Sequence, residues 1–198
     1  HPTESGFTTD VLALYDWAKA RSGDSPVIFW GHSLGTGIAT NAARKLQEER
    51  GVQVDAVVLE SPYTSIRDAA AHVPITKIYR QFPGFESLIL DSMARGGMFF
   101  RSDENVKVLS CPLLILHAED DAVLPPRLGR QVGAARRPRG VTEAVTGRDG
   151  PLASPQLFEA ARGAYADKAK VKLVTFPKEL GLGHDYISSN PELPALLK

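Results

Sequence analysis

The chain has 198 residues, and its 23 basic and 23 acidic side chains cancel to a formal net charge of zero, so charge supports no nucleic-acid partner. Hydrophobic residues make up 43% of the chain and charged residues 23%, which is typical of one folded domain with a substantial core rather than a disordered segment. The single cysteine, Cys111, excludes an internal disulfide framework, and no apolar run approaches the roughly 20 residues that span a bilayer.

The predicted elements alternate between helices and apolar strands. A helix is expected over Thr8–Arg21, where apolar residues recur every three or four positions, then a strand over Val27–Trp30 and a second helix over Thr36–Glu49. Three further strands are predicted at Val54–Leu59, Leu113–Leu116 and Val171–Phe176. These runs are mostly apolar without alternation, and helical segments separate most of them. The fold class is therefore α/β, with a mostly parallel sheet covered on both faces.

Two stretches interrupt this rhythm. Residues 62–108 are too long for one simple crossover and rich in aromatic side chains, so we interpret them as a cap-like insertion over a site; an ordinary loop-and-helix crossover is the alternative. Residues 132–156 contain glycine, proline and arginine but no Ile, Phe, Tyr or Trp, and we predict a disordered, mobile loop. Because the first residue is His rather than Met, we expect 1–198 to be a single domain truncated at its N-terminus.

The most informative motif is Gly31-His32-Ser33-Leu34-Gly35, at the junction between the first predicted strand and the second predicted helix. A Gly-x-Ser-x-Gly in this place is typical of a nucleophile elbow, a tight turn that holds a serine hydroxyl at the N-terminus of a helix. The turn is expected to leave no room for side chains beside the serine, hence the two glycines. The partial positive charge and free N–H groups of the helix end suit a developing oxyanion. The bare pattern occurs by chance in about one chain in twenty of this length, so the flanking elements carry the prediction.

A serine nucleophile needs a histidine base, and the base needs a carboxylate that fixes its tautomer. Behind such an elbow the three residues follow in the chain order serine, acid, histidine. Three carboxylates follow the third predicted strand, namely Glu119, Asp120 and Asp121. We favour Asp121 because it stands four residues after His117 and three before the apolar step Leu124–Pro125. The other two stay open as candidates, and a solvated turn or a helix cap is the alternative explanation for them.

The base is expected after the last strand, where His184 lies between glycines in a loop that would let its ring swing into the site. The other four histidines are weaker candidates. We expect His32 to pack or to line the pocket and His117 to anchor the acid loop, while His72 lies in the cap-like stretch and His1 is terminal. No His-Glu-x-x-His motif or Cys/His cluster predicts a metal, and no motif calls for a cofactor.

The oxyanion of an acyl transfer needs two backbone N–H donors. One is predicted at Leu34, directly after the nucleophile. The second normally follows an earlier strand, which would precede residue 1, so we expect these 198 residues by themselves to be poorly active. A catalytically impaired piece that serves only as a binding module is therefore one alternative.

Eight short motifs, spread over nearly all of the chain outside residues 132–156, carry a resemblance to a known family. They are Lys19–Gly23, Trp30–Gly37, Leu59–Thr64, Tyr79–Arg80, Phe82–Phe85, Asp103–Lys107, Cys111–Asp121 and Asn190–Pro194. With them the chain resembles the α/β-hydrolase domain-containing 12 family, and its 12B branch more closely. The resemblance implies a partial α/β-hydrolase fold and places the family's triad on Ser33, Asp121 and His184.

The resemblance further implies a serine hydrolase that acts on monoacylglycerols and lysophospholipids, notably lysophosphatidylserine. A lipid ester would then be its partner, with no cofactor. It also implies that the intact protein is anchored in the endoplasmic reticulum membrane by an upstream segment. For the 12B branch, the lipid activity is carried over from its relatives. A peptidase or a thioesterase stays open as an alternative, because fold and triad do not fix the substrate.

Residues 132–156 have no counterpart in the family pattern. Their removal would restore one helix face, on which Leu128, Leu157, Ala161 and Tyr165 follow at four-residue steps. The segment begins with valine, whose codons start with GT, and ends with glutamine, one of whose codons is CAG. We therefore hypothesise a retained intron or a gene-model error. A mature transcript that lacks these codons would support the hypothesis, and abundant full-length transcript would contradict it.

Overall fold

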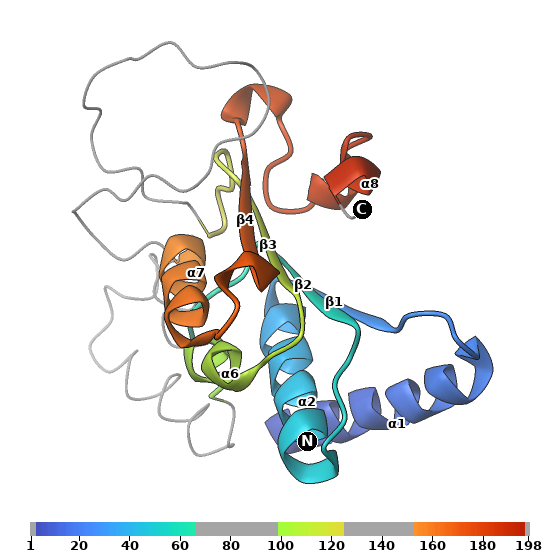
Figure 1. Cartoon of the computed structure of the whole chain (residues 1–198). Helices are drawn as coiled ribbons and strands as arrows, with labels where there is room; N and C mark the ends of the chain where they lie inside the picture. Colours follow the sequence, from blue (N-terminus) through green and yellow to red (C-terminus); the bar gives the residue numbers. More distant parts are fainter. Residues whose placement is uncertain (1–2, 66–98, 125–152, 197–198) are drawn as a thin grey trace.

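The computed structural model describes residues 3–65, 99–124 and 153–196, and a four-stranded parallel sheet lies at its centre (Figure 1). The strands are β1 (Ile28–His32), β2 (Ala56–Glu60), β3 (Leu113–Ala118) and β4 (Val171–Phe176), and they lie side by side in chain order. Every neighbouring pair is parallel, so the carboxyl ends of the strands meet at one edge of the sheet. The α/β fold class predicted from the sequence is confirmed.

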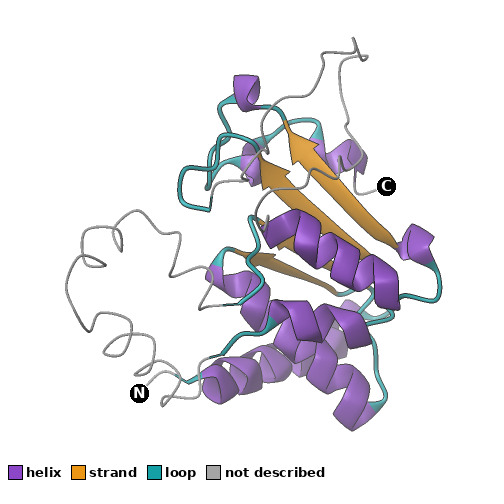
Figure 2. Ribbon diagram, turned by 90° about the vertical axis from the view of Figure 1, so that its left-hand side faces the viewer, coloured by secondary structure: helices purple, strands orange, loops and turns teal. Residues whose placement is uncertain are grey.

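Helices cover the two faces of this sheet in the ranges that the structure describes. One face carries α2 (Leu34–Arg50), α6 (Ser102–Val108) and α7 (Ala153–Ala164), and α1 (Glu4–Ser22) packs against α2. The opposite face carries η4 (Ile187–Ser189) and α8 (Leu193–Leu196), while the short turns η2 (Lys168–Lys170) and η3 (Lys178–Leu180) flank β4 in the chain. Figure 2 looks onto the face that α7 covers. None of the described helices is both long and apolar enough to cross a membrane.

The main core lies between the sheet and the layer formed by α2, α6 and α7. Val57 and Leu59 of β2 and Ile115 of β3 are fully buried there, together with Leu46 of α2 and Leu157 of α7. Burial of one such side chain stabilises the fold by about 1.5–3 kcal/mol. This packing fixes α2 against the sheet, and Ser33 of the candidate site directly precedes α2.

Three element boundaries differ from the prediction, and two of them adjoin Ser33. Strand β1 continues to His32, and α2 begins at Leu34, so a single residue separates strand from helix. Helix α1 begins four residues earlier than predicted, because the hydroxyl of Thr3 accepts the Gly6 N–H at 3.0 Å and caps the first turn. The remaining strands begin or end within two residues of their predicted positions.

The cap-like range 62–108 is described only at its two ends, and residues 66–98 lie outside the described residues. The described ends belong to the body of the fold rather than to a cap. Tyr63 and Phe100 are buried in one cluster with Ile38 of α2, and α6 packs between α2 and α7. The cap-like insertion itself falls on residues 66–98, outside the described residues, and stays a prediction.

The predicted loop 132–156 falls outside the described residues as far as residue 152. Its last four residues form the first turn of α7, so the prediction of a loop is wrong there. The physical reason is burial: Ser154 is 1% exposed and Leu157 fully buried, and a helix brings both to the core face. Composition alone did not reveal this, because the preceding residues are polar and rich in glycine.

Candidate active site

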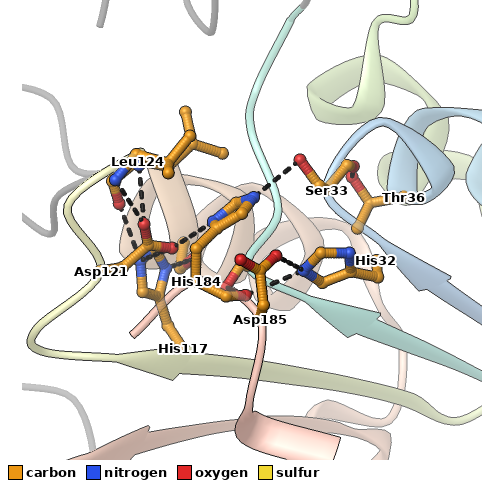
Figure 3. A network of polar contacts seen from close by, with 11 residues as sticks. His32, Ser33, Thr36, His117, Asp121, Leu124, His184 and Asp185 are labelled. Carbon is orange, nitrogen blue, oxygen red and sulfur yellow. Dashed lines mark hydrogen bonds and ion pairs between the residues drawn. The ribbon is translucent and has the colours of Figure 1, made fainter. Parts of the chain in front are cut away.

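The predicted site residues lie together at the carboxyl edge of the sheet, each on a segment that follows a strand. Ser33 follows β1 directly, Asp121 lies three residues after the end of β3, and His184 lies in the loop after β4. Figure 3 shows the ring of His184 between the Ser33 hydroxyl and the Asp121 carboxylate. In open α/β sheets this edge is where ligands bind.

Ser33 occupies a strained turn between β1 and α2. Its backbone has φ 49° and ψ −118°, a conformation that residues with side chains rarely adopt, so the surrounding structure must hold it. A Cβ atom on Gly31 would collide with the carbonyl oxygen of Gly35, which explains the glycine at the first position of the motif. At Gly35 itself a Cβ would meet nothing within 4 Å. The expected steric need for glycine is therefore confirmed before the serine and wrong after it.

A third glycine, Gly37, leaves space for the buried Tyr63 to reach the main chain next to Ser33. A Cβ on Gly37 would come within 2.5 Å of the Tyr63 hydroxyl and 2.8 Å of the Phe100 Cβ. The Tyr63 hydroxyl donates to the Leu34 carbonyl at 3.3 Å, and burial raises the pKa of Tyr63, so the hydroxyl keeps its proton. Sequence reasoning missed this support. The sequence signal for it was Gly37, a second glycine in the first turn of the helix, because glycine there lowers helix stability by about 1 kcal/mol.

The acid loop holds Asp121 firmly. The carboxylate is fully buried, and its Oδ1 accepts the N–H groups of Val123 at 2.9 Å and Leu124 at 2.8 Å. Its Oδ2 accepts Nδ1–H of His184 at 2.8 Å. Burial acts to raise the pKa of Asp121, but these hydrogen bonds and the neighbouring histidines outweigh burial and hold that pKa below its ordinary value. The carboxylate is therefore ionised at neutral pH.

His117, near the end of β3, ties the acid loop to α7. Burial lowers the pKa of His117, which keeps the ring neutral with a single N–H. Nε2–H donates to the Leu124 carbonyl at 2.9 Å, and Nδ1 accepts the Ser154 hydroxyl. The expectation that His117 anchors the acid loop is confirmed. Its bond with Ser154 was not predicted, because that residue lay in the stretch interpreted as a loop.

His184 joins the acid to the serine. Its Nδ1 proton is donated to Asp121, so the lone pair of Nε2 faces the Ser33 hydroxyl at 3.0 Å. The hydrogen bond with Asp121 raises the pKa of His184 above the ordinary 6.5, burial opposes that rise, and the charges of Asp121, Asp185 and Glu60 add to it. Such an imidazole can accept a proton from serine while the carboxylate stabilises the resulting cation.

Among the described residues, the other two acid candidates, Glu119 and Asp120, make no hydrogen bond to His184. The Glu119 carboxylate accepts the Lys178 N–H at 3.3 Å, and Asp120 Oδ1 is buried without a hydrogen-bond partner among the described residues. His1 and His72 lie outside the described residues. The geometry therefore agrees with the spacing argument that favoured Asp121.

Three comparisons with known proteins show what this chain is similar to. Residues 1–95 match the model of the family described as Serine aminopeptidase, S33. Over 197 residues the chain is 47% identical to the lysophosphatidylserine lipase ABHD12 of Macaca fascicularis. This match covers 100% of the chain and 43% of that protein. Over 192 residues it is 45% identical to the human Protein ABHD12B, covering 97% of this chain and 45% of that protein. An esterase from Pyrococcus furiosus superposes with a TM-score of 0.57 at 12% identity, over 96% of this chain and 58% of that one.

The chain has the α/β-hydrolase fold. Its resemblance to the α/β-hydrolase domain-containing 12 family, expected from eight motifs, is confirmed. The expectation of a closer match to the 12B branch is not, since the identity is 45% to ABHD12B and 47% to ABHD12. The chain spans less than half the length of these two relatives, at 43% and 45%.

In an α/β-hydrolase the first oxyanion donor is the N–H group of the residue after the nucleophile. Leu34 has that place here and is also the first residue of α2. The first N–H groups of a helix have no acceptor within the helix, so the Leu34 N–H is available to a ligand beside Ser33. The role of Leu34 stays a prediction that the geometry allows.

One group of described residues could hold a cation by distance alone. His32, His184 and Asp185 place possible ligand atoms within 4.8 Å of one another. Both ring nitrogens of His184 already face Asp121 and Ser33, and Nε2 of His32 donates to the His184 carbonyl at 2.8 Å. These hydrogen bonds occupy both ring nitrogens of His184 and Nε2 of His32, so we assign no metal to the group.

Proposed function

We propose that the protein containing this chain is a serine hydrolase that cleaves carboxylic esters of lipids, of the monoacylglycerol and lysophospholipid type. The observation that carries the proposal is the chain of two hydrogen bonds from Ser33 through His184 to Asp121, at 3.0 and 2.8 Å. The substrate class rests on the relatives, because the protein that shares 47% of residues with this chain is named a lysophosphatidylserine lipase. Lysophosphatidylserine is therefore the first substrate to test.

In the first half-reaction, Ser33 Oγ attacks the ester carbonyl carbon while its proton passes to Nε2 of His184. The Leu34 N–H, at the positive end of α2, stabilises the negative charge that develops on the carbonyl oxygen. Asp121 stabilises the imidazolium without taking its proton. Collapse of the tetrahedral intermediate breaks the bond to the alcohol, whose oxygen takes the proton from Nε2, and the acyl group stays on Ser33.

In the second half-reaction, water attacks the carbonyl carbon of the acyl-serine and gives a proton to Nε2 of His184. That proton then passes to Ser33 Oγ as the fatty acid leaves. The residues end in their starting state, and the cycle consumes only water and the ester.

A peptidase is the second candidate, because the matching family model is described as a serine aminopeptidase. Amide cleavage would use the same serine, histidine and aspartate, and the geometry of the three does not distinguish an ester from an amide. Only turnover of matched substrates separates the two activities.

The test is to give the full-length protein lysophosphatidylserine, a monoacylglycerol and an aminoacyl amide in parallel. We expect release of fatty acid from both lipids at rates well above the release of amine from the amide, and loss of these activities in Ser33→Ala. Faster turnover of the amide than of either lipid would overturn the lipase proposal in favour of the peptidase.

We also propose, on the strength of the family resemblance, that the intact protein is held at the endoplasmic reticulum membrane by a segment outside this chain. Cell fractionation followed by carbonate extraction tests this. Recovery of the full-length protein in the extracted membranes is expected, and its release into the soluble fraction would contradict the proposal.

A further inference from the structure

The carbonyl oxygen of His184 accepts hydrogen bonds from the ends of two neighbouring strands. His32, the last residue of β1, donates Nε2–H to it at 2.8 Å, and Ser61, which follows β2, donates its hydroxyl at 3.4 Å. The two donors reach the same edge because the sheet pairs His32 with Glu60. In Figure 3 the ring of His32 lies beside the main chain of His184 and Asp185, close to Ser33. The main chain of the proposed base is thus fastened to the strand that carries the proposed nucleophile.

The loop that carries His184 depends on such contacts. Gly181 and Gly183 have positive φ, at 63° and 54°, and the residues between η3 and η4 form turns rather than helix or strand. The hydrogen bond between the His184 ring and Asp121 orients the ring, and within the loop the Tyr186 N–H donates to the Leu182 carbonyl at 3.0 Å. The two side-chain donors at the His184 carbonyl add the link between this loop and the ends of β1 and β2.

Glu60 holds the same loop at a second point. Its carboxylate is 2% exposed, and Oε1 accepts the Ser188 N–H at 3.0 Å while Oε2 accepts the indole N–H of Trp30 at 2.9 Å. The segment is therefore fastened at two points, at the His184 carbonyl and, four residues later, at the Ser188 N–H. Both contacts come from the ends of β1 and β2, the strands on the nucleophile side of the sheet.

We propose that His32 is a positioning residue for the base, an inference that rests on the proposed function. His32 and Ser33 are consecutive, so His32 anchors the main chain of His184 while Ser33 meets its ring. A movement of the elbow carries both contacts with it, which preserves the 3.0 Å distance between Ser33 Oγ and His184 Nε2 that proton transfer requires. His32 touches no reacting atom and acts through His184.

The contact also fixes the chemistry that His32 must supply. A carbonyl oxygen only accepts hydrogen bonds, so Nε2 of His32 must carry a proton. The Asp185 carboxylate lies 3.7 Å from the same nitrogen. A glutamine side chain can present an N–H at a similar reach, whereas leucine supplies apolar volume without a donor.

Two variants of the full-length protein separate the hydrogen bond that the His32 side chain donates from the volume that it fills. We expect His32→Leu to lower kcat roughly tenfold, the scale of one hydrogen bond lost from a positioned group. KM and the midpoint of thermal unfolding should stay close to those of the wild type, and the rate of fluorophosphonate labelling at Ser33 should fall with kcat. His32→Gln should retain most of the wild-type kcat. A merely structural role would instead move the unfolding midpoint and treat the two variants alike.

Ser61→Ala gives a second line of evidence, because it removes the longer bond to the same carbonyl. We expect a smaller fall in kcat than in His32→Leu, and a loss in the double variant that exceeds the sum of the single losses, since either donor alone can partly hold the oxygen. Thr9→Ala is the matched control. It removes a hydroxyl that donates to the Ser5 carbonyl at 2.9 Å on the exposed side of α1, and it should leave kcat unchanged.

The outcomes are separable from those of the proposed function. A wild type that neither hydrolyses the esters nor reacts with the probe overturns the proposed function. If the wild type is active and His32→Leu has the same kcat and labelling rate, only the positioning role is overturned. The positioning role is also overturned if kcat falls as far in His32→Gln as in His32→Leu. If His32→Leu does not fold, retention in His32→Gln together with loss in Ser61→Ala supports the role, and an unchanged Ser61→Ala contradicts it.

Discussion

The acid and the base of the proposed triad are held in different ways. Asp121 is 1% exposed and accepts three hydrogen bonds, two of them from its own loop, while His117 ties that loop to α7. His184 lies instead on a loop with two glycines at positive φ, and strand-end side chains hold its carbonyl. The acid is buried and held by hydrogen bonds from its own loop, whereas the loop of the base is held by side chains at the ends of β1 and β2.

The difference fits what each residue must do. The acid keeps one protonation state and one partner throughout the proposed cycle, so burial and a dense set of hydrogen bonds serve it well. The base takes a proton from serine, gives it to the leaving group and then repeats the exchange with water. Strand-end side chains that hold the His184 carbonyl keep the ring in place through these exchanges and leave Nε2 facing Ser33.

The largest effect is expected when the acid loses its charge. In Asp121→Asn the side-chain amide would donate to Nδ1 of His184, which would place the ring proton on Nε2 and turn it toward Ser33. We expect kcat for ester hydrolysis to fall by about 10³–10⁴-fold, measured from initial rates of the full-length protein. Asp120→Asn is the control in the same loop, and a loss as large as that of Asp121→Asn would show that the acid has been misassigned.

The next effect concerns the rigidity of the acid loop. His117→Leu would leave the Leu124 carbonyl and the Ser154 hydroxyl without their partner in a buried place, and we expect the free energy of unfolding to fall by about 2–4 kcal/mol. Ser154→Ala removes one hydrogen bond and should cost about 1 kcal/mol. Urea unfolding of the two variants beside the wild type measures both. Unchanged midpoints would contradict the contrast between a rigid acid loop and a lightly held base loop.

The smallest effect is on the pH dependence of the base. His184 must be neutral to accept a proton, and the hydrogen bond with Asp121 raises its pKa, so kcat/KM should rise with pH through a midpoint above 6.5. Asp185→Asn removes one of the negative charges that raise the pKa of His184, so the midpoint should move to lower pH with little change in the plateau. Rate profiles of the wild type and the variant measure the shift, and a midpoint that stays or moves upward would count against this account of the base.

The parts of the site that sequence reasoning found are those with local signals. An apolar run marks each strand, five residues mark the elbow around Ser33, and chain order behind successive strands leads to Asp121 and His184. These signals need only neighbouring residues and the rule that parallel strands end at one edge.

The parts that it missed are contacts between distant residues. His32 meets the His184 carbonyl across 152 positions, and Ser61 meets it across 123. No local pattern says which side chain will face a carbonyl in a distant loop, and a histidine inside the motif looked like a pocket residue. Ser154 was missed because its surroundings in the chain are polar, whereas its own side chain is buried against His117.

The central claim is that Ser33 is a nucleophile activated by His184, and covalent labelling tests it most directly. A fluorophosphonate reacts with a serine whose hydroxyl a neighbouring base has activated. We predict that mass spectrometry of the labelled, digested full-length protein finds the adduct on the peptide containing Ser33, and that Ser33→Ala abolishes it. An adduct on another residue, or labelling that persists in Ser33→Ala, would contradict the account.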